Sequence, residues 1–432
     1  MSSPPQESSS PRSSSDHPPP TLSKAVLANT KRLGSVRVGG RFKLARRLGG
    51  GAFGDVYYAT DMNNNDQVAV KLEPTHSIHQ PHLQHEARLY HYLHKHCPIV
   101  VGVPKMRWYG REGDFNVLVM DLLGPSLEDL FEFCGRSFDM KTVMMLADQM
   151  ISRLEFLHAM NYLHRDLKPE NFVMGLGKKA HHVYIIDMGL AKKFRDSKTG
   201  AHIPYIDGKS LTGTARYVSI NTHLGIQQSR RDDMEALAIV LIYFARGGLP
   251  WQGVKCPTKQ AKYERIKMLK MQISSQTLCE KLPNAFLVFL MYTRSLGFEE
   301  SPDYTRCRKL FSDAMDEHNM DMDYDFAWLK LSTKNRETNK DQPAVVYPKS
   351  STTGATARWG GTTAMSVSGH TDQDQASMTG SQAFHSPNGR YTRLASFDEI
   401  ALSQRAGDGL DDDNRPEESP QVGGLRNESG ST

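Results

Sequence analysis

The chain has 432 residues, a net charge of only +5, and 38% hydrophobic residues with a mean hydropathy of −0.52. So small a charge gives no argument for a nucleic-acid partner, and we expect none. The longest apolar run, Ala236–Ala245, is about half of the roughly 20 residues that a membrane span requires.

Polar segments occupy both ends of the chain. Residues 1–37 are rich in Ser and Pro, and residues 335–432 are rich in Ser, Thr, Gly, Gln and Asp with little aliphatic patterning. Such segments cannot bury enough apolar surface to offset chain entropy, so we expect both to be disordered. The residues between them suffice for a substantial core.

The five cysteines are scattered, with no C-x-x-C pair and no Cys/His metal spacing. The N-terminus has no apolar signal segment, and neither end has a lipidation motif. We therefore expect reduced thiols, no membrane anchor, and a location in the cytoplasm, with the nucleus as a second compartment.

A glycine-rich segment is the first motif in chain order. Gly49, Gly51 and Gly54 occur at the positions of a G-x-G-x-x-G pattern between Leu48 and Val56. Because glycine has no side chain, backbone N–H groups can approach phosphate oxygens closely there. Dinucleotide-binding proteins use the same pattern, but with a helix directly after it, and glycine clusters also form ordinary turns.

The residues after the glycines predict strands. Residues 56–59 are β-branched and aromatic, the Asn/Asp cluster at 63–66 predicts a turn, and 67–72 predicts the returning strand. On that strand Lys71 shares a face with Ala69, beneath the glycine loop. The alternative is an exposed lysine on an amphipathic strand.

A helix predicted from residue 82 to 93 places a carboxylate on its inward face. Glu86 is followed three, four and seven residues later by apolar residues that lie on the same side of the helix. An inward carboxylate needs a cation, and Lys71 is the expected partner.

The most informative motif is the polar run 161–171, which contains His164, Asp166, Lys168 and Asn171. This spacing is typical of the catalytic loop of protein kinases, where the Asp accepts the substrate hydroxyl proton and the Asn holds a metal ion. For a bare His-Arg-Asp triplet, a solvated polar turn would be the alternative.

Downstream, an apolar strand predicted at 183–186 leads to Asp187 and Gly189. Mg²⁺ prefers carboxylate and phosphate oxygens, so Asp187 is predicted to be a metal ligand, with an Asx turn as the alternative. Between them, Met188 stands where kinases usually carry Phe. Methionine is flexible, so the balance between active and inactive positions of this loop is open.

These motifs, in this order, resemble the casein kinase 1 family of protein kinases over residues 38–330. The segment 219–225, Ser-Ile-Asn-Thr-His-Leu-Gly, indicates this branch most, because most kinases carry Ala-Pro-Glu there. Segments 122–130, 164–171, 211–217 and 228–233 also fit. The resemblance implies an α+β, bilobal kinase fold with a small β-rich lobe at 38–122, a large helical lobe at 123–334, and a regulatory tail at 335–432.

The resemblance implies a role for each motif residue. Asp166 would accept the hydroxyl proton, Lys168 would stabilise the γ-phosphate, and Asn171 and Asp187 would hold Mg²⁺. Asp233, at the start of a buried helix that contains the apolar run, would anchor the catalytic loop. The implied ATP-binding residues are Leu48, Gly49, Gly51, Gly54, Val56, Ala69, Lys71, Glu86, the gatekeeper Met120, and Asp121 and Leu123, whose backbone would bind adenine.

Basic residues are implied to select the substrate. In the resembled family an anion site reads a phosphate or an acidic residue upstream of the target. The matching residues are Arg216, Gly253 and Lys262, and a second anion site would use Arg165, Lys192 and Lys209. The alternative for Arg216 is an ion pair with an internal carboxylate. Residues 259–262 are less basic than the corresponding loop of the family, which leaves open how strongly this chain would bind a substrate phosphate.

The tail contains many hydroxyls tethered to the catalytic domain. Asp374 lies three residues before Ser377, which fits the implied specificity, so we expect autophosphorylation at Ser377. The phosphorylated tail would then compete with substrates for the anion sites. An inert tail, or one used only for partner docking, is the alternative.

Other functions stay open at this point. The expected function is a monomeric, ATP- and Mg²⁺-dependent Ser/Thr kinase that acts on acidic or phosphorylated protein substrates. A pseudokinase scaffold is disfavoured, because Lys71, Glu86, Asp166, Asn171 and Asp187 are all present. A kinase of the tau-tubulin or vaccinia-related branch is the third possibility.

Overall fold

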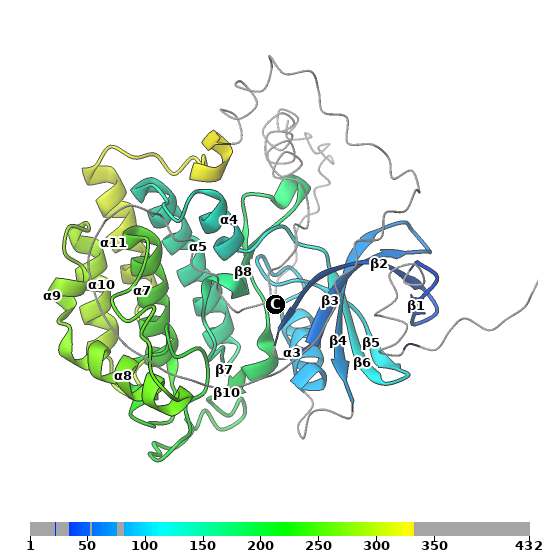
Figure 1. The fold of residues 1–432 in the computed structure, drawn as a ribbon, viewed down its shortest axis with the longest axis horizontal. Helices are drawn as coiled ribbons and strands as arrows, with labels where there is room; N and C mark the ends of the chain where they lie inside the picture. Colours follow the sequence, from blue (N-terminus) through cyan, green and yellow to red (C-terminus); the bar gives the residue numbers. More distant parts are fainter. Residues whose placement is uncertain (1–21, 23–33, 52–53, 76–81, 332–432) are drawn as a thin grey trace, which may run out of the picture.

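The computed structural model describes residues 22, 34–51, 54–75 and 82–331. They form two lobes, a small one built on an antiparallel sheet and a large one built mainly of helices (Figure 1). The sheet has the strand order β1-β2-β3-β4-β6-β5. Its strands are β1 (Arg37–Val38), β2 (Phe42–Gly51), β3 (Gly54–Asp61), β4 (Gln67–Pro74), β5 (Met106–Glu112) and β6 (Phe115–Asp121).

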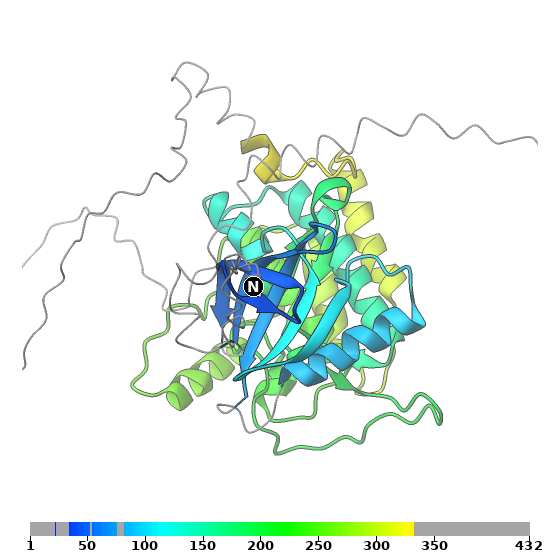
Figure 2. The same ribbon diagram turned by 90° about the vertical axis from the view of Figure 1, so that its right-hand side faces the viewer.

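The expected glycine hairpin and the strand that returns from it are β2, β3 and β4. On β4 the residues alternate, since Val68, Val70 and Leu72 are buried in the small-lobe core while Ala69 and Lys71 lie on the other face. The two-residue period of a strand therefore directs Lys71 away from the core, as the sequence predicted. Figure 2 shows the sheet from the side of the small lobe.

The small-lobe core extends N-terminal to residue 38, where the sequence expected the domain to begin. Val36 is fully buried, and Leu22 is only 2% exposed in the same apolar cluster. The backbone N–H of Asp114, in the β5–β6 turn, donates to the carbonyl of Leu22 at 3.4 Å. The expectation of disorder is therefore wrong for Leu22 and for residues 34–37, while 1–21, 23–33 and 335–432 lie outside the described residues.

Helix α3 (His82–His96) lies beside the sheet (Figure 1), and a side chain from a strand caps its N-terminal end. Its first turn has no acidic residue of its own. Instead Glu73, fully buried on β4, accepts hydrogen bonds from the backbone N–H groups of His82 at 2.9 Å and Leu83 at 3.1 Å. A carboxylate satisfies free N–H groups at a helix N-terminus and suits the helix dipole, so Glu73 fixes where α3 starts.

The large lobe is organised around two long buried helices, α5 (Met140–Ala159) and α7 (Arg230–Arg246). The apolar run that is too short for a membrane forms most of α7 and is buried on nearly all sides. None of the helices in the described ranges is long and apolar enough to cross a membrane. The other named helices of this lobe are α4 (Leu127–Phe133), α6 (Ile220–His223), α8 (Lys259–Gln272), α9 (Ser275–Leu278), α10 (Asn284–Ser295) and α11 (Tyr304–Glu317), and residues 327–331 are also helical.

Short elements between α5 and α6 carry the polar motifs. The catalytic-loop motif lies between β7 (Tyr162–Leu163) and β8 (Phe172–Met174), and includes the 3₁₀ turn η1 (Pro169–Asn171). The strand predicted at 183–186 is β9 (Val183–Ile185), which pairs with β8. Three further short elements are the 3₁₀ turns η2 (Gly177–Lys179) and η3 (Met188–Leu190), and the strand β10 (Lys192–Lys193).

All five cysteines lie in the described residues and are free thiols. Burial raises the pKa of Cys134 to about 12, of Cys279 to about 11 and of Cys307 to about 12. Cys97 and Cys256 are partly exposed.

Candidate active site

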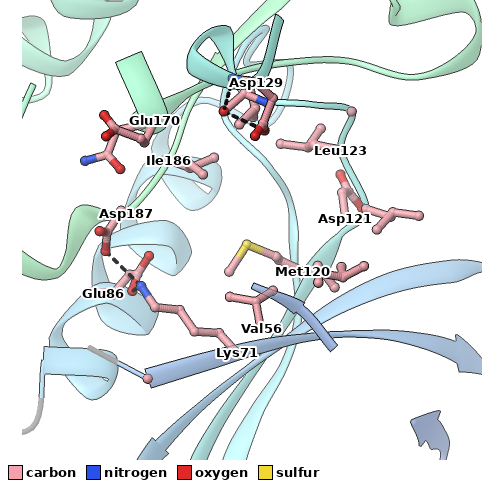
Figure 3. Close-up of a pocket in the computed structure, with 18 residues that line it drawn as sticks. Val56, Lys71, Glu86, Met120, Asp121, Leu123, Asp129, Glu170, Ile186 and Asp187 are labelled. Atoms are coloured by element: carbon pink, nitrogen blue, oxygen red, sulfur yellow. Dashed lines mark hydrogen bonds and ion pairs between the residues drawn. The ribbon is translucent and has the colours of Figure 1, made fainter. Parts of the chain in front are cut away.

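A pocket lies where the two lobes meet, and most of the predicted ATP-binding residues line it (Figure 3). The predicted residues in its wall are Leu48, Gly54, Val56, Ala69, Lys71, Glu86, Met120, Asp121, Leu123, Asn171 and Asp187. Gly49 and Gly51 belong to β2, and Gly49 is not among the described residues that line the pocket. Two residues of the glycine loop, 52 and 53, lie outside the described residues.

Lys71 connects the two lobes at the inner end of this pocket. Its ammonium group donates to Glu86 Oε2 at 2.7 Å and to Asp187 Oδ1 at 2.8 Å (Figure 3). Burial alone would lower the pKa of Lys71, but the carboxylates of Asp187 and Glu86 raise it above the ordinary lysine value. The predicted pairing of Lys71 with Glu86 is confirmed, and the pairing of Lys71 with Asp187 is an addition to it.

The carboxylate of Asp187 stays ionised although its side chain is only 19% exposed. Burial would raise its pKa, but the adjacent Lys71 lowers it to about 2. Its backbone is left-handed, with φ 65° and ψ 65°, a conformation that non-glycine residues adopt at a cost of about 1–3 kcal/mol. Such strain is concentrated at functional sites, where the surrounding structure enforces it.

Asp166 is held by a side chain on each carboxylate oxygen. Lys168 Nζ donates to Oδ2 at 2.7 Å, and Thr214 Oγ1 donates to Oδ1 at 2.7 Å. The side-chain amide of Asn171 donates to the backbone carbonyl of Asp166 at 2.8 Å. The catalytic-loop motif therefore brings its carboxylate, ammonium and carboxamide together around one point.

Asp233, at the start of α7, anchors the backbone of the catalytic loop. Its carboxylate accepts hydrogen bonds from the backbone N–H groups of His164 at 2.8 Å and Arg165 at 2.9 Å, as the resemblance implied. His158 Nε2 also bonds it at 3.0 Å. Arg165 is left-handed, with φ 69°, so the loop needs such an anchor to keep its shape.

The donor set fits a Mg²⁺ ion. Asn171 donates through its nitrogen to Asp166, so its amide oxygen remains as an acceptor. Asp187 supplies an ionised carboxylate, and both residues line the same pocket. Carboxylate and amide oxygens are ligands that Mg²⁺ accepts alongside phosphate oxygens.

The basic residues of the second predicted anion site lie close together. Burial lowers the pKa of Lys192, and the charges of Arg165 and Lys209 lower it further. Lys192 also bonds Gln227 Oε1 at 3.1 Å, and Arg165 Nε donates to the carbonyl of Leu190 at 2.7 Å. Three cations that repel one another so directly are suited to binding an anion.

The contacts of the described residues bring together only part of the first predicted anion site. Trp251 Nε1 donates to the Arg216 carbonyl at 2.8 Å, which places the backbone of Arg216 near the loop of Gly253. The guanidinium of Arg216 lies over the ring of Tyr217, with no carboxylate within ion-pair distance among the described residues. Among the described residues, Arg216 therefore forms no ion pair with an internal carboxylate, which was the alternative. Lys262 lies exposed in the first turn of α8.

Several site residues were missed by sequence reasoning. Thr214 is the most important, since it bonds Asp166 from 48 residues away in the chain. No local pattern points to that contact, because it depends on how the segment after β10 folds back. The other lining residues that were not predicted are Gly124, Ser126, Asp129, Glu170, Val173 and Ile186. For Ser126 and Asp129 a signal existed, because they form a capping box at the start of α4.

Comparison with known families agrees with this geometry. The family model for the protein kinase domain matches residues 42–311, which is more than half of the chain. The matched range contains strands β2 to β6, the residues that line the pocket, and the loops that carry Asp166 and Asp187. Protein kinase domains generally use ATP and Mg²⁺ and act on protein substrates. The chain therefore belongs to the protein kinase family.

Proposed function

We propose that this protein kinase is a casein kinase 1-like Ser/Thr kinase that transfers the γ-phosphate of ATP to acidic or phosphate-primed protein substrates. The observation that carries the transferase activity is the fixed carboxylate of Asp166, bonded by Lys168 and Thr214 next to the pocket. The Ser/Thr specificity and the casein kinase 1 branch rest on the sequence resemblance alone. We also propose that it acts in the cytoplasm and the nucleus, because its five scattered cysteines are typical of reduced thiols.

The residues divide the work of phosphoryl transfer. Asp166 orients the hydroxyl of the acceptor and takes its proton on a carboxylate oxygen, while Lys168 brings positive charge toward the transferred group. Lys71, fixed by Glu86, would bind the α- and β-phosphates. Bound Mg²⁺ neutralises phosphate charge, and Asn171 and Asp187 would hold it.

The direct test is an assay of the full-length protein with Mg²⁺, labelled ATP and casein, followed by identification of the phosphorylated amino acid. Phosphoserine or phosphothreonine is the expected product. A protein that binds ATP but phosphorylates neither casein nor peptides would be a pseudokinase scaffold. Exclusive phosphotyrosine would reject the Ser/Thr assignment.

Substrate selection follows from the basic residues near Arg216. We expect peptides with a phosphoserine three residues before the target Ser to be preferred. In Lys262→Ala and Arg216→Ala, kcat/KM on primed peptides should fall roughly tenfold, because a charge-assisted contact to phosphate is lost. Activity on unprimed peptides should fall less. Steady-state kinetics on matched peptide pairs measure the ratio.

Lys259→Ala is the matched control, because Lys259 lies on the same helix as Lys262 and is similarly exposed. It should leave the ratio of primed to unprimed rates unchanged. If Arg216→Ala lowers both rates equally, Arg216 supports the fold of the loop and does not read phosphate.

The tail is proposed to be both substrate and inhibitor. After preincubation with ATP, truncation after about residue 335 should raise activity, because a tethered tail is present at about millimolar local concentration. Mass spectrometry should find Ser377 phosphorylated in the full chain. Phosphatase should then activate the full chain but not the truncated one. Equal rates before and after phosphatase in both proteins would leave the tail without an inhibitory role.

A further inference from the structure

Helix α3 is bonded to the backbone of the loop that carries Asp187 by two histidines. His82 Nδ1 lies 3.3 Å from the carbonyl oxygen of Gly189, and His85 Nε2 lies 2.8 Å from that of Ala191. A carbonyl oxygen accepts only, so each of these ring nitrogens carries the proton and donates. The two histidines are three residues apart and therefore share one face of α3.

Each backbone carbonyl of residues 188–191 accepts a hydrogen bond. Met188 O accepts the N–H of Ala191 at 3.0 Å, and Leu190 O accepts Arg165 Nε at 2.7 Å. The two carbonyls between and after them are those bonded by the histidines. The loop is thus bonded from the catalytic loop on one side and from α3 on the other.

The same helix face also carries Glu86. Its Oε1 accepts the backbone N–H of Met188 at 3.3 Å, while its Oε2 bonds Lys71. Three side chains of α3 therefore contact the backbone of residues 188–191, and Figure 1 shows α3 on the side of the sheet that faces the helical lobe. The position of Asp187 then depends on where α3 lies.

The residue after Asp187 gives a reason for these bonds. Met188 is fully buried in the large apolar cluster, where its unbranched side chain has more rotamers than an aromatic ring. Asp187 itself is left-handed and strained. A flexible side chain alone fixes a strained backbone poorly, whereas hydrogen bonds to the backbone fix it directly.

We propose that His82 and His85 are positioning residues that keep Asp187 in place for phosphoryl transfer by bonding the backbone of its loop to α3. This inference rests on the proposed kinase activity for its kinetic test but also has a structural test. Neither histidine contacts ATP or substrate in this role. Both act through the loop.

The kinetic test uses the full-length chain with His82→Ala and His85→Ala combined. The double variant should have a kcat roughly tenfold lower, which corresponds to about 1.4 kcal/mol of lost loop positioning. Half-saturation by Mg²⁺ should move to higher concentration, because Asp187 is less well placed. The KM for the peptide should not change.

Conservative variants separate hydrogen bonding from packing. Asn places its side-chain N–H₂ where His carries Nδ1, and Gln places it where His carries Nε2. His82→Asn with His85→Gln should therefore retain most of the wild-type kcat. His91→Ala is the control, since His91 is an exposed histidine of the same helix. It should behave as wild type.

Amide hydrogen exchange gives a readout that does not need activity. The N–H of Ala191 should exchange several-fold faster in the Ala double variant than in the wild type or the Asn/Gln variant. Unchanged exchange and unchanged kcat in the Ala variant would overturn the proposal. So would equal losses in the Ala and Asn/Gln variants, which would indicate packing. If the wild type shows no kinase activity, the proposed function fails, and the exchange result still decides whether the histidines fix the loop.

Discussion

Asp166→Asn should lower kcat by about 10²–10⁴-fold, because positioned general acid–base groups contribute that much to proton transfer. The substitution keeps the size of the side chain, and its amide oxygen can still accept from Thr214. Its N–H₂ group instead faces the ammonium of Lys168 and cannot take a proton. We therefore expect a folded, ATP-binding protein with almost no phosphoryl transfer, measured on casein at saturating ATP.

Asp207→Asn is the matched control, since Asp207 is exposed in the segment between β10 and α6. It should keep the wild-type rate. If purified Asp166→Asn protein, with the same thermal midpoint as the wild type, phosphorylates casein normally, the role given to Asp166 is incorrect.

The largest effect on stability is expected from Asp233→Ala. This change removes the acceptor for the N–H groups of His164 and Arg165 and for His158. A buried donor left unpaired costs about 1–3 kcal/mol, so the variant should lose about 3 kcal/mol or more of the free energy of unfolding. Urea unfolding monitored by fluorescence measures it. Asp316→Ala, at an exposed position on α11, should change stability by less than about 0.5 kcal/mol.

The same residue gives a pH dependence whose direction follows from its pKa. Burial would raise the pKa of Asp233, but the hydrogen bond and charge of His158 lower it below the ordinary value. Stability that depends on this carboxylate is therefore present above about pH 4 and is lost as the pH falls through the folded-state pKa. The difference between wild type and Asp233→Ala should shrink in acid. A difference that grows as the pH falls would contradict this.

Local patterns predicted those parts of the site that depend on one element at a time. The period of a strand placed Lys71, the period of a helix placed Glu86, and the two met as expected. The anchoring role of Asp233, at the start of the buried helix α7, was implied by the resemblance to kinases and not by a local pattern.

Such local patterns could not predict contacts between segments that are far apart in the sequence. Asp187 is 116 residues from Lys71, and its pairing depends on how the two lobes meet. Glu73, which caps α3 from a neighbouring strand, looks in the sequence like an ordinary strand residue. The burial of Leu22 within a Ser/Pro-rich segment is a third case, because composition averages over residues and one leucine does not change it.

The distribution of the cysteines makes the native chain suitable for selective labelling. Thiol reagents attack the thiolate, and the raised pKa values of Cys134, Cys279 and Cys307 leave very little thiolate at neutral pH. The partly exposed Cys97 and Cys256 are the remaining reaction sites. Cys256 lies three residues after Gly253, in the loop proposed to bind substrate phosphate, so a fluorophore attached there would report peptide binding without any engineered residue.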